Sequence, residues 1–425
     1  MNDNGRYSLR FTLNPHDDKD CDGTSRTESS LTHVSEFQVS REAILKYLGP
    51  DEIFVEISGK TMQSFLPTYI GCGTYSVEFF IKQSGVYHLS IVKLRSDYTA
   101  VNEVDKIFPL FEYQTLVAEW FWLDQNKIPE GTCPYGNSQG VWSIKEENVD
   151  QARGVYDKLA LAKNTVPSLL ERDSNATIPM YVNLTDSYPL THHCVDKVSQ
   201  YGWDPQDCGQ NFITHAEAGK LLERKRVVFS GDSQMRTLAV SFFHFACGAP
   251  LTFNNRIPSF YLPKTHAQCR GLSMSYVNNA YCNAAELPRG EGVDLLVANC
   301  GHHPASGTGA QYPIPKYVEL VENFTQALPT RGYTPRNMVW MESLPLPLRK
   351  DQVVIDVCDW RTFDRIRIFN TLANHILGSR DFPVLSVFLA MLPLANKLCD
   401  NAHYTSLHSN DPIIQQILSN LLHKR

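Results

Sequence analysis

The stretch Lys225-Arg226-Val227-Val228-Phe229-Ser230-Gly231-Asp232-Ser233-Gln234-Met235-Arg236 indicates the fold of the C-terminal part of this chain. Its apolar run, residues 227–229, is typical of a strand that is buried on both faces. Gly231 permits a tight turn, and residues 236–247 then follow helical spacing. Ser233 is therefore expected above the carboxyl edge of a sheet, where α/β proteins place their ligands.

Outward from this stretch, strand-like runs alternate with helical ones to the end of the chain. The expected strands are 226–230, 294–298, 337–341 and 382–388, and the expected helices are 236–247, 316–327 and 361–377. Such alternation predicts an α/β fold in which helices cover both faces of a parallel sheet. We expect this three-layer α/β/α domain to span residues 226–425.

The N-terminal part has a different pattern. Residues 7–13 alternate strictly between apolar and polar, which is the period of a half-buried strand. A second strand is expected at 53–57, and residues 74–81 and 86–94, separated by a short turn with a glycine, suggest a hairpin. These runs predict a β-sandwich of the immunoglobulin or filamin kind over residues 1–115.

A segment rich in cysteine and aromatic residues, 116–225, is expected to connect the two domains and to pack on the second. Cys21 and Cys72 are the only cysteines of the expected sandwich, and the sequence leaves open whether they pair.

Composition excludes several classes of protein. The 425 residues carry a net charge of −6 and no basic block, which argues against a nucleic-acid binder. The most apolar stretch, residues 382–398, is too short and too broken by proline and polar residues to span a membrane. No C-x-x-C occurs among the 11 cysteines, so zinc ribbons are excluded and no metal site is expected.

Compartment is indicated by the cysteines, which are spread widely and odd in number. Their spacing favours a lumenal or extracellular protein with some disulfides over a cytosolic enzyme with buried thiols. Sequons for N-glycosylation at Asn175, Asn183 and Asn323 agree with that location. No apolar segment follows Met1, so we expect no signal peptide within this sequence. The expected location is the secretory pathway lumen (Golgi) or the extracellular space.

A second motif supports catalysis at Ser233. Asp400 and His403 stand three positions apart near the C-terminus, a spacing that brings both side chains to one face of a turn. The carboxylate then holds the imidazole in the tautomer whose other nitrogen accepts the proton of a serine. The alternative for Gly-Asp-Ser is a helix cap formed by Asp232 or Ser233.

These residues resemble the PC-esterase branch of the SGNH (GDSL-like) hydrolase superfamily. That branch includes the trichome-birefringence-like polysaccharide O-acetyltransferases, the sialate and capsule O-acetyltransferases, and the neurexophilin-and-PC-esterase proteins. The resemblance extends over about residues 116–425 and rests on four segments: Gly231-Asp232-Ser233 with Arg236, Asp400-x-x-His403, Trp203-Asp204-Pro205 with Cys208, and Asn299-Cys300-Gly301-His302. A β-sandwich before such a domain is similar to the neurexophilin-and-PC-esterase arrangement.

The resemblance implies a role for each matching residue. Ser233 is the nucleophile, His403 the general base and then acid, and Asp400 its orienting partner. Asn299 fits the asparagine of the oxyanion hole, with Gly248 or Gly271 as its glycine. In addition, Arg236 anchors the turn or meets the substrate, and His302 lines the pocket. The sequence departs from the family at Asn401-Ala402 and at Tyr404, which stands where tryptophan is common.

The predicted activity is serine-dependent transfer or hydrolysis of an acyl group, most simply acetyl, on carbohydrate or glycoconjugate O-acetyl esters, through a Ser233 acyl-enzyme. No cofactor is implied beyond an acetyl donor as co-substrate of a transferase. The sequence leaves open the choice between transferase and esterase, and also the oligomeric state. The alternative function is that of a non-catalytic secreted glycoprotein which acts as a binding module.

Overall fold

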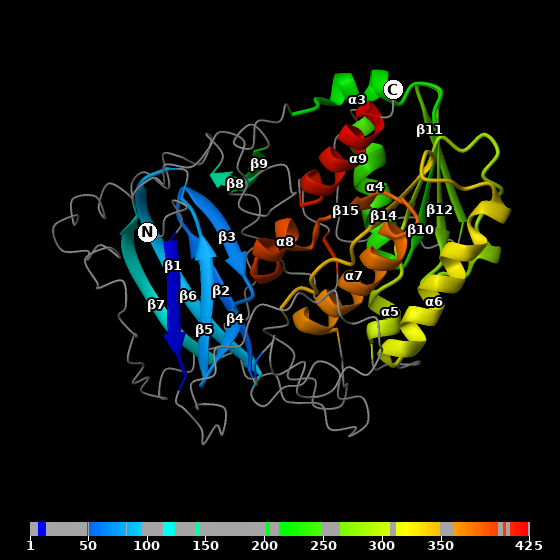
Figure 1. Cartoon of the computed structure of the whole chain (residues 1–425). Coiled ribbons are helices and arrows are strands. Elements are labelled where there is room, and N and C mark those ends of the chain that lie inside the picture. The colour runs from blue at the N-terminus through cyan, green and yellow to red at the C-terminus, as the bar shows by residue number, and fades with distance from the viewer. Residues whose placement is uncertain are drawn as a thin grey trace.

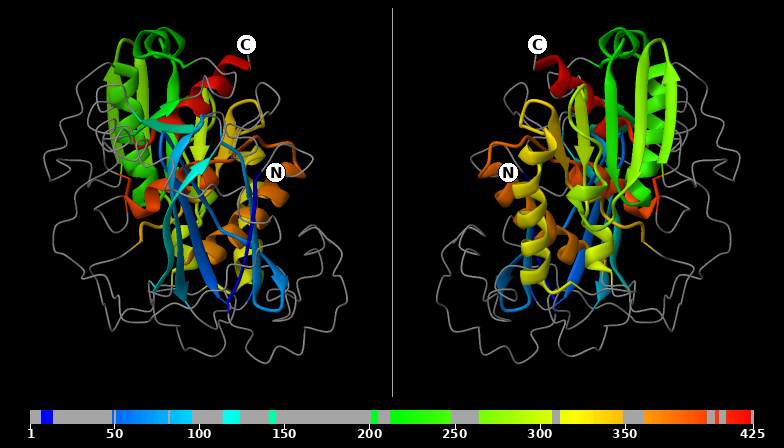
Figure 2. Two further views of the ribbon diagram at one scale, coloured as in Figure 1. Left: turned by 90° about the vertical axis from the view of Figure 1, so that its left-hand side faces the viewer. Right: turned by 90° about the vertical axis from the view of Figure 1, so that its right-hand side faces the viewer.

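The structure is a computed structural model, and it describes residues 7–13, 49, 51–81, 83–95, 114–123, 141–144, 201–204, 212–247, 264–306, 312–348, 361–397, 403–404 and 409–423. Within these residues an N-terminal unit of antiparallel sheets lies beside a C-terminal unit of mixed helices and strands (Figure 1). Figure 2 shows the two units from either side.

Two antiparallel sheets form the N-terminal unit. Among the described residues, the smaller sheet has the strand order β1-β5-β4 and the larger has the order β7-β6-β2-β3-β8-β9. The strands are β1 (Tyr7–Thr12), β2 (Glu52–Ser58), β3 (Thr61–Phe65), β4 (Thr68–Gly71), β5 (Thr74–Phe79), β6 (Gly85–Arg95), β7 (Gln114–Leu123), β8 (Val141–Ile144) and β9 (Tyr201–Asp204).

Both sheets bury their apolar residues in one core, which includes Phe11 of β1, Val77 of β5, Val55 of β2 and Phe121 of β7. Strand β1 alternates between buried and exposed positions, as its sequence predicts, because only one of its faces meets this core. Two sheets packed face to face on one core are a β-sandwich architecture.

The hairpin predicted from residues 74–94 is wrong. Strand β5 pairs with β1 and β4, whereas β6 pairs with β2 and β7. The short turn between them carries the chain from one sheet to the other. Both strands face the same core from opposite sides, with Phe79 and Leu89 as examples, so their apolar patterns look like those of hairpin partners.

The expected boundaries shift in the same region. The boundary at residue 115 falls inside β7. Strands β8 and β9, which come from the expected connecting segment 116–225, extend the larger sheet of the N-terminal unit. Trp203 of β9 is buried in the core of the C-terminal unit. Cys72 carries a free thiol, so a disulfide between Cys21 and Cys72 is not formed.

The C-terminal unit has an α/β fold. In its described residues, the sheet has the order β11-β12-β10-β13-β14-β15, in which β11 is an antiparallel edge strand and the other five are parallel. Its strands are β10 (Arg226–Gly231), β11 (Lys264–Cys269), β12 (Leu272–Asn278), β13 (Leu295–Ala298), β14 (Met338–Met341) and β15 (Val384–Leu385).

The helices of this unit are α3 (His215–Leu221), α4 (Ser233–Cys247), α5 (His302–Ala305), α6 (Ile314–Ala327), α7 (Phe363–Gly378), α8 (Phe388–Met391) and α9 (Asp411–His423), with short 3₁₀ turns η5 (Ala284–Glu286), η6 (Pro329–Arg331) and η7 (Leu392–Asn396). The predicted helices over 316–327 and 361–377 are confirmed, and the one over 236–247 begins three residues earlier.

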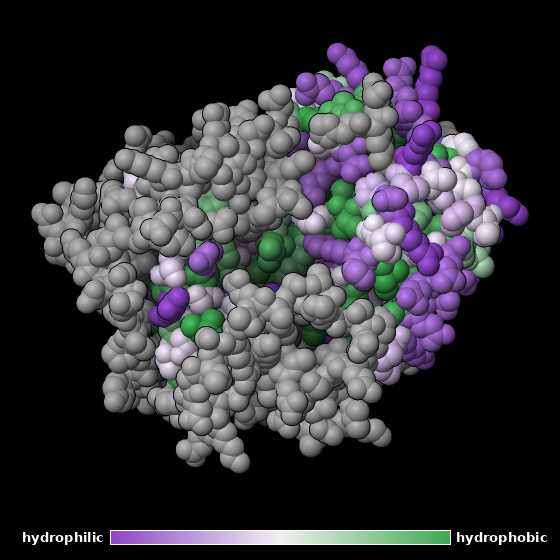
Figure 3. Space-filling view, viewed as in Figure 1, coloured by the Kyte–Doolittle hydropathy of each residue, from purple (hydrophilic) through white to green (hydrophobic). Residues whose placement is uncertain are grey.

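Helices cover both faces of the parallel sheet. Val227 and Phe229 of β10 face a core shared with α3, α4 and α9, while Val228 between them faces a core shared with α6 and α7. This arrangement explains the unbroken apolar run of β10, since successive side chains point to opposite faces and both faces are buried. The outer face of α6 is hydrophilic, as expected of a covering helix (Figure 3).

The expected strand over 382–388 is mostly wrong. Only Val384–Leu385 form β15, opposite Trp340 and Met341 at the end of β14, and helix α8 begins at Phe388. The pairing ends there because β14 itself ends at Met341.

Strand β2 joins the two units, because both of its faces are buried. Phe54 packs in the core that α6 and α7 help to form, and its ring centroid lies 5.9 Å from that of Phe363. Glu56 forms an ion pair with Lys397, with 2.6 Å between Oε1 and Nζ. The sandwich and the α/β unit therefore share a buried interface.

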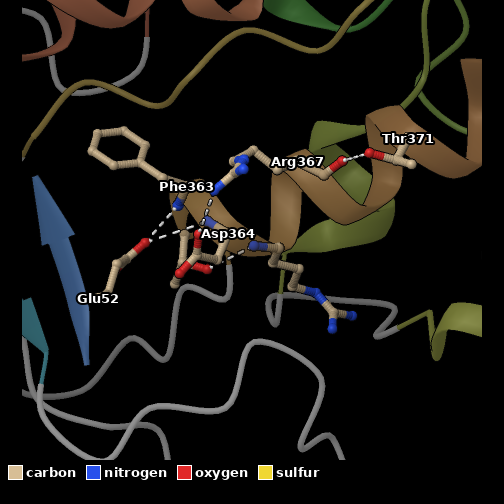
Figure 4. A network of polar contacts seen from close by, with 7 residues as sticks. Glu52, Phe363, Asp364, Arg367 and Thr371 are labelled. Carbon is tan, nitrogen blue, oxygen red and sulfur yellow. Dashed lines mark hydrogen bonds and ion pairs between the residues drawn. The ribbon is translucent and has the colours of Figure 1, made fainter. Parts of the chain in front are cut away.

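Glu52 completes this interface at the start of α7 (Figure 4). One oxygen of its carboxylate accepts hydrogen bonds from the backbone N–H groups of Phe363, at 2.8 Å, and Asp364, at 3.4 Å, and the other pairs with Arg95. A carboxylate from the sandwich thus caps a helix of the other unit. Burial and, after it, the neighbouring charge of Glu52 raise the pKa of Asp364 to about 7.

Two disulfides, Cys247–Cys269 and Cys282–Cys300, are formed within the described part of the chain. In the same residues, no helix has both the length and the apolar character that crossing a lipid bilayer requires.

Candidate active site

Ser233 lies where β10 turns into α4. The strand ends at Gly231, and Asp232 precedes the first residue of the helix. Oδ1 of Asp232 accepts a hydrogen bond from the N–H of Gln234 at 2.9 Å. The backbone carbonyl of Asp232 accepts one from the N–H of Arg236 at 3.1 Å. Asp232 is therefore the helix cap that the sequence offered as an alternative, and the hydroxyl of Ser233 is left for other contacts.

The hydroxyl of Ser233 contacts His403. Oγ of Ser233 lies 2.9 Å from Nε2 of His403, although 170 positions separate the two residues in the sequence. With the ring proton on Nδ1, Nε2 accepts the hydroxyl hydrogen of Ser233. This is the geometry that a serine nucleophile and its general base require. Asp400, the expected orienting carboxylate, lies outside the described residues.

Tyr404, the residue after His403, holds the histidine in this position. Tyr404 is fully buried, and its hydroxyl donates to the carbonyl of Pro345 at 2.5 Å. Its own carbonyl accepts from Nδ2 of Asn410 at 2.9 Å, and the same Nδ2 donates to Oγ of Ser241 on α4 at 2.9 Å. The histidine segment is thereby attached to the helix that begins with Ser233. Tyr404 thus has a structural role of its own.

The Ser233–His403 pair lies at the point where the strand order reverses. In chain order the parallel strands are β10, β12, β13, β14 and β15, but in space β10 lies between β12 and β13. The chain therefore leaves β10 and β13 toward opposite sides, and the switch point lies between the carboxyl ends of these two strands. This is where α/β sheets of the order 2-1-3-4-5 bind their ligands.

The backbone N–H of Ser233 is available to a ligand. As the first residue of α4 it has no acceptor in the preceding turn, and it donates to no acceptor within the described part of the chain. It lies at the positive end of the helix dipole, which stabilises negative charge. The N–H of Ser233 is thus a candidate donor to an oxyanion formed on the serine.

Gly231 is required at this turn for steric reasons. A Cβ atom there would lie 2.8 Å from Cβ of Met235 and 2.9 Å from the carbonyl oxygen of Asn299. Only a residue without a side chain lets the ends of β10 and β13 approach this closely.

Asn299 lies next to this turn, directly after β13, and is buried. Its Nδ2 donates to the carbonyl of Met341 at 2.8 Å and to Oγ of Ser343 at 3.0 Å, so both amide hydrogens are used within the protein. Its Oδ1 accepts from the N–H of Gly301 at 3.4 Å. In this geometry Asn299 joins the loops after β13 and β14, and its expected role in the oxyanion hole stays a prediction.

The structure places the remaining predicted residues in different surroundings. Arg236 is half-buried on the first turn of α4. Burial raises the pKa of Tyr276, and Arg236 is close enough for its positive charge to oppose that rise in part. His302 is buried at the start of α5, whereas His303 is exposed, with its ring 5.8 Å from that of Tyr281.

Of the two candidate glycines, Gly248 lies outside the described residues. Gly271 lies in the turn between β11 and β12, where its φ is +81°. A Cβ there would meet the backbone of Arg224, which precedes β10. Gly271 is therefore at the opposite edge of the sheet from Ser233, and it is ruled out as an oxyanion donor.

Two residues of β12 and the loop after it support the turn, and the sequence analysis missed both. The hydroxyl of Tyr276 donates to the carbonyls of Gly231, at 3.1 Å, and Asp232, at 2.9 Å. The N–H of Asn279 also donates to the carbonyl of Gly231, at 2.8 Å. The alternation of apolar and polar residues over 272–276 is the signal that predicts this strand.

A disulfide strengthens the same edge of the sheet. Cys282 follows β12, Cys300 follows Asn299, and their bond ties the loop after β12 to the loop after β13. In the described part of the chain, no group of three or more His, Cys, Asp or Glu side chains is arranged to hold a metal ion.

No protein-family model matches the chain, and no curated protein matches its sequence significantly.

Proposed function

We propose that this protein is a serine-dependent acyl-transfer enzyme that forms an acyl-enzyme at Ser233. The observation that carries the proposal is the 2.9 Å contact between Oγ of Ser233 and Nε2 of His403 at the carboxyl edge of the parallel sheet. A free serine hydroxyl is too weakly acidic to act as a nucleophile, so a neighbouring imidazole is needed to take its proton. Both groups are in place.

The proposed first half-reaction acylates the serine. Oγ of Ser233 attacks the carbonyl carbon of an ester while Nε2 of His403 takes the hydroxyl proton. The negative charge that develops on the carbonyl oxygen is stabilised by the N–H of Ser233 at the start of α4. The tetrahedral intermediate then breaks the bond to the leaving alcohol, and His403 returns the proton to that oxygen.

The second half-reaction restores the enzyme. Water or a hydroxyl group of an acceptor attacks the acyl carbonyl, with His403 again as the base. Water gives net hydrolysis, and a sugar hydroxyl gives O-acyl transfer. For a transferase, exclusion of water from the site is required, because water competes for the acyl-enzyme.

The finer assignment belongs to the same proposal. Gly231-Asp232-Ser233, Asp400-x-x-His403 and Asn299-Cys300-Gly301-His302 resemble the PC-esterase branch of the SGNH hydrolases, and we infer an SGNH-type domain that acts on O-acetyl esters of carbohydrates. The N-terminal sandwich is proposed to be of the immunoglobulin or filamin kind. The two disulfides support a lumenal or extracellular location.

Hydrolysis of p-nitrophenyl acetate by the full chain tests the proposal. Ser233→Ala and His403→Gln are each expected to lower kcat at least about 10³-fold, because each removes a partner of the reacting pair. The matched control is His375→Gln, an exposed histidine on α7 that is expected to keep wild-type turnover. Equal rates for wild type and Ser233→Ala, with both proteins folded, would refute a Ser233 mechanism. Added sugars that speed release of p-nitrophenol would identify a transferase.

A further inference from the structure

The hydroxyl of Tyr276 contacts the two peptide units that precede the nucleophile. Tyr276 lies on β12, opposite Phe229 of β10 in the parallel register, and is 3% exposed. Its Oη donates to the carbonyl of Asp232 at 2.9 Å and to that of Gly231 at 3.1 Å. One hydroxyl hydrogen is therefore shared between the last two carbonyls before Ser233.

The contact with Asp232 also determines where the N–H of Ser233 points. The carbonyl of Asp232 and the N–H of Ser233 belong to one peptide unit, which is planar and trans, so the two groups point in opposite directions. A donor that fixes the direction of the carbonyl oxygen therefore also fixes the opposite direction of the N–H. In the proposed function, this N–H of Ser233 donates the hydrogen bond that stabilises the oxyanion.

A second donor to the same carbonyl does not make Tyr276 redundant. The N–H of Arg236 donates to the carbonyl of Asp232 at 3.1 Å as part of α4. That bond runs within the helix and moves with its first turn. Tyr276 attaches the same oxygen to the neighbouring strand, and the N–H of Asn279 attaches the carbonyl of Gly231 to the loop after that strand. The orientation of the turn relative to the sheet thus depends on β12.

We propose that Tyr276 is a positioning residue for catalysis: its hydroxyl holds the Asp232–Ser233 peptide so that the N–H of Ser233 points at the oxyanion of the tetrahedral intermediate. This inference rests on the proposed function. It assigns a role to a residue on β12, which carries neither the nucleophile nor the base.

The surroundings of Tyr276 keep its hydroxyl in the donating form. Burial and then the negative charge of Asp232 raise the pKa of Tyr276, and the positive charge of Arg236 opposes them only in part. The phenol stays protonated at neutral pH.

Tyr276→Phe tests this role, with Tyr333→Phe as the matched control. Tyr333 is also buried, and its hydroxyl also donates to a backbone carbonyl, that of Pro288, at 3.0 Å. Tyr333→Phe thus removes the same kind of hydrogen bond from a different loop. With p-nitrophenyl acetate, Tyr276→Phe is expected to lower kcat about 10- to 100-fold and to leave KM within about twofold, because oxyanion stabilisation acts in the transition state. Tyr333→Phe is expected to match wild type.

A transition-state analogue separates positioning from a general structural effect. An alkyl boronic acid forms a tetrahedral adduct with a serine Oγ and places an oxygen where the oxyanion develops. Its inhibition constant is expected to weaken in Tyr276→Phe by the same factor as kcat/KM. p-Aminophenylalanine at position 276, which keeps a donor on the ring, is expected to restore kcat to within about threefold of wild type. If the Tyr276→Phe protein fails to fold, the kcat of the p-aminophenylalanine protein is the measurement that tests the inference.

Three results would overturn the inference. One is a folded Tyr276→Phe protein with kcat within twofold of wild type. Another is an equal loss of kcat in Tyr333→Phe. The third is a tenfold loss in the p-aminophenylalanine protein. Failure of the proposed function gives a different result, since wild type then shows no turnover above Ser233→Ala and both proposals fall together.

Discussion

At the scale of single residues, the candidate site consists of Ser233, His403 and the few side chains that contact them. Asp232 caps α4 with its carboxylate, so the serine beside it keeps a hydroxyl directed at Nε2 of His403 and an N–H with no acceptor among the described residues. Gly231 makes this possible, since any side chain there would collide with Met235 and with the backbone of Asn299. The proposed nucleophile and oxyanion donor thus belong to one residue, and the proposed base lies 2.9 Å from its hydroxyl.

Gly231→Ala is expected to destabilise the protein by about 1–3 kcal/mol, the usual cost of forcing extra atoms into a packed site. It is also expected to lower kcat, because the carbonyl of Asn299 or the first turn of α4 must move. Urea unfolding and ester hydrolysis measure the two effects.

Gly378→Ala is the control for that substitution. A Cβ at Gly378, the last residue of α7, meets no atom within 4 Å. Alanine there is expected to raise the free energy of unfolding by about 0.5 kcal/mol, because it restricts the unfolded chain. Equal stabilities of the two alanine variants would contradict the steric reason given for Gly231.

At the scale of elements, the site depends on strand ends that the chain ties together. The loops after β12 and β13 are joined by Cys282–Cys300 at the edge of the sheet where Ser233 lies. Cys247–Cys269 joins the last residue of α4 to the last residue of β11, which pairs with the first residue of β12. The second disulfide therefore lies at the opposite edge, away from the nucleophile.

Removal of either disulfide is expected to lower stability, whereas only one of the two removals is expected to lower activity. Replacing Cys282 and Cys300 by alanine, or Cys247 and Cys269 by alanine, is expected to lower the free energy of unfolding by about 3 kcal/mol in either case, since the closed loops are of similar length. Only the first pair is expected to lower kcat, because its loops hold Asn299 and Asn279. An equal loss of kcat in both double variants, at a temperature where both are folded, would show that these loops have no particular role.

At the scale of the whole molecule, the two units share a core and a buried set of charges. Strand β2 buries Ile53 and Val55 within the sandwich and Phe54 against α7. Glu52 and Glu56, on the same face as Phe54, contact α7 and Lys397. Unfolding of the sandwich alone would expose these groups, so we expect both units to unfold together.

Asp364 makes this junction sensitive to pH. Its pKa is raised to about 7 in the folded protein and returns to its ordinary value near 4 on unfolding. Its contribution to stability is fully present below that ordinary value and is lost as pH rises to about 7, because over this range the unfolded chain gives up the proton while the folded protein keeps it. Glu52 faces it as a second carboxylate, and Arg367 and Arg95 are the neighbouring cations.

Asp364→Asn is expected to remove this dependence. The difference in unfolding free energy between variant and wild type should grow in favour of the variant between about pH 4 and 7, by at most about 1.4 kcal/mol per pH unit, and then stay constant. Urea unfolding of both proteins from pH 4 to 8 measures it. A difference that does not change with pH would show that folding does not raise the pKa of Asp364.

The parallel sheet and the turn that carries Ser233 could be predicted from the sequence, because each depends on a pattern of neighbouring residues. The apolar run of β10, the turn at Gly231 and the helical spacing after it lie within about twenty residues, and they form the strand, turn and helix that contain Ser233. The pairing of Ser233 with His403 was predicted from chemistry, since a serine nucleophile needs a base.

Contacts between units could not be predicted, because they depend on packing. Glu52 and Glu56 alternate with Ile53 and Val55, and the pattern predicts a polar face in water, yet these carboxylates are 1% and 4% exposed. The false hairpin has the same cause, since the pattern of a strand does not say which of two facing sheets it joins. The support given by Tyr276 was missed because β12 was not recognised as a strand.

The central claim is that Ser233 becomes acylated, and the intact mass of the protein tests it most directly. The full chain is incubated with p-nitrophenyl acetate, quenched in acid, weighed by mass spectrometry and mapped by peptides, beside Ser233→Ala. We expect wild type to gain about 42 Da, the mass of an acetyl group that replaces a hydrogen, on the peptide that contains Ser233, and Ser233→Ala to gain nothing there. A folded wild-type protein that gains no mass, or gains it equally in Ser233→Ala, would contradict the claim.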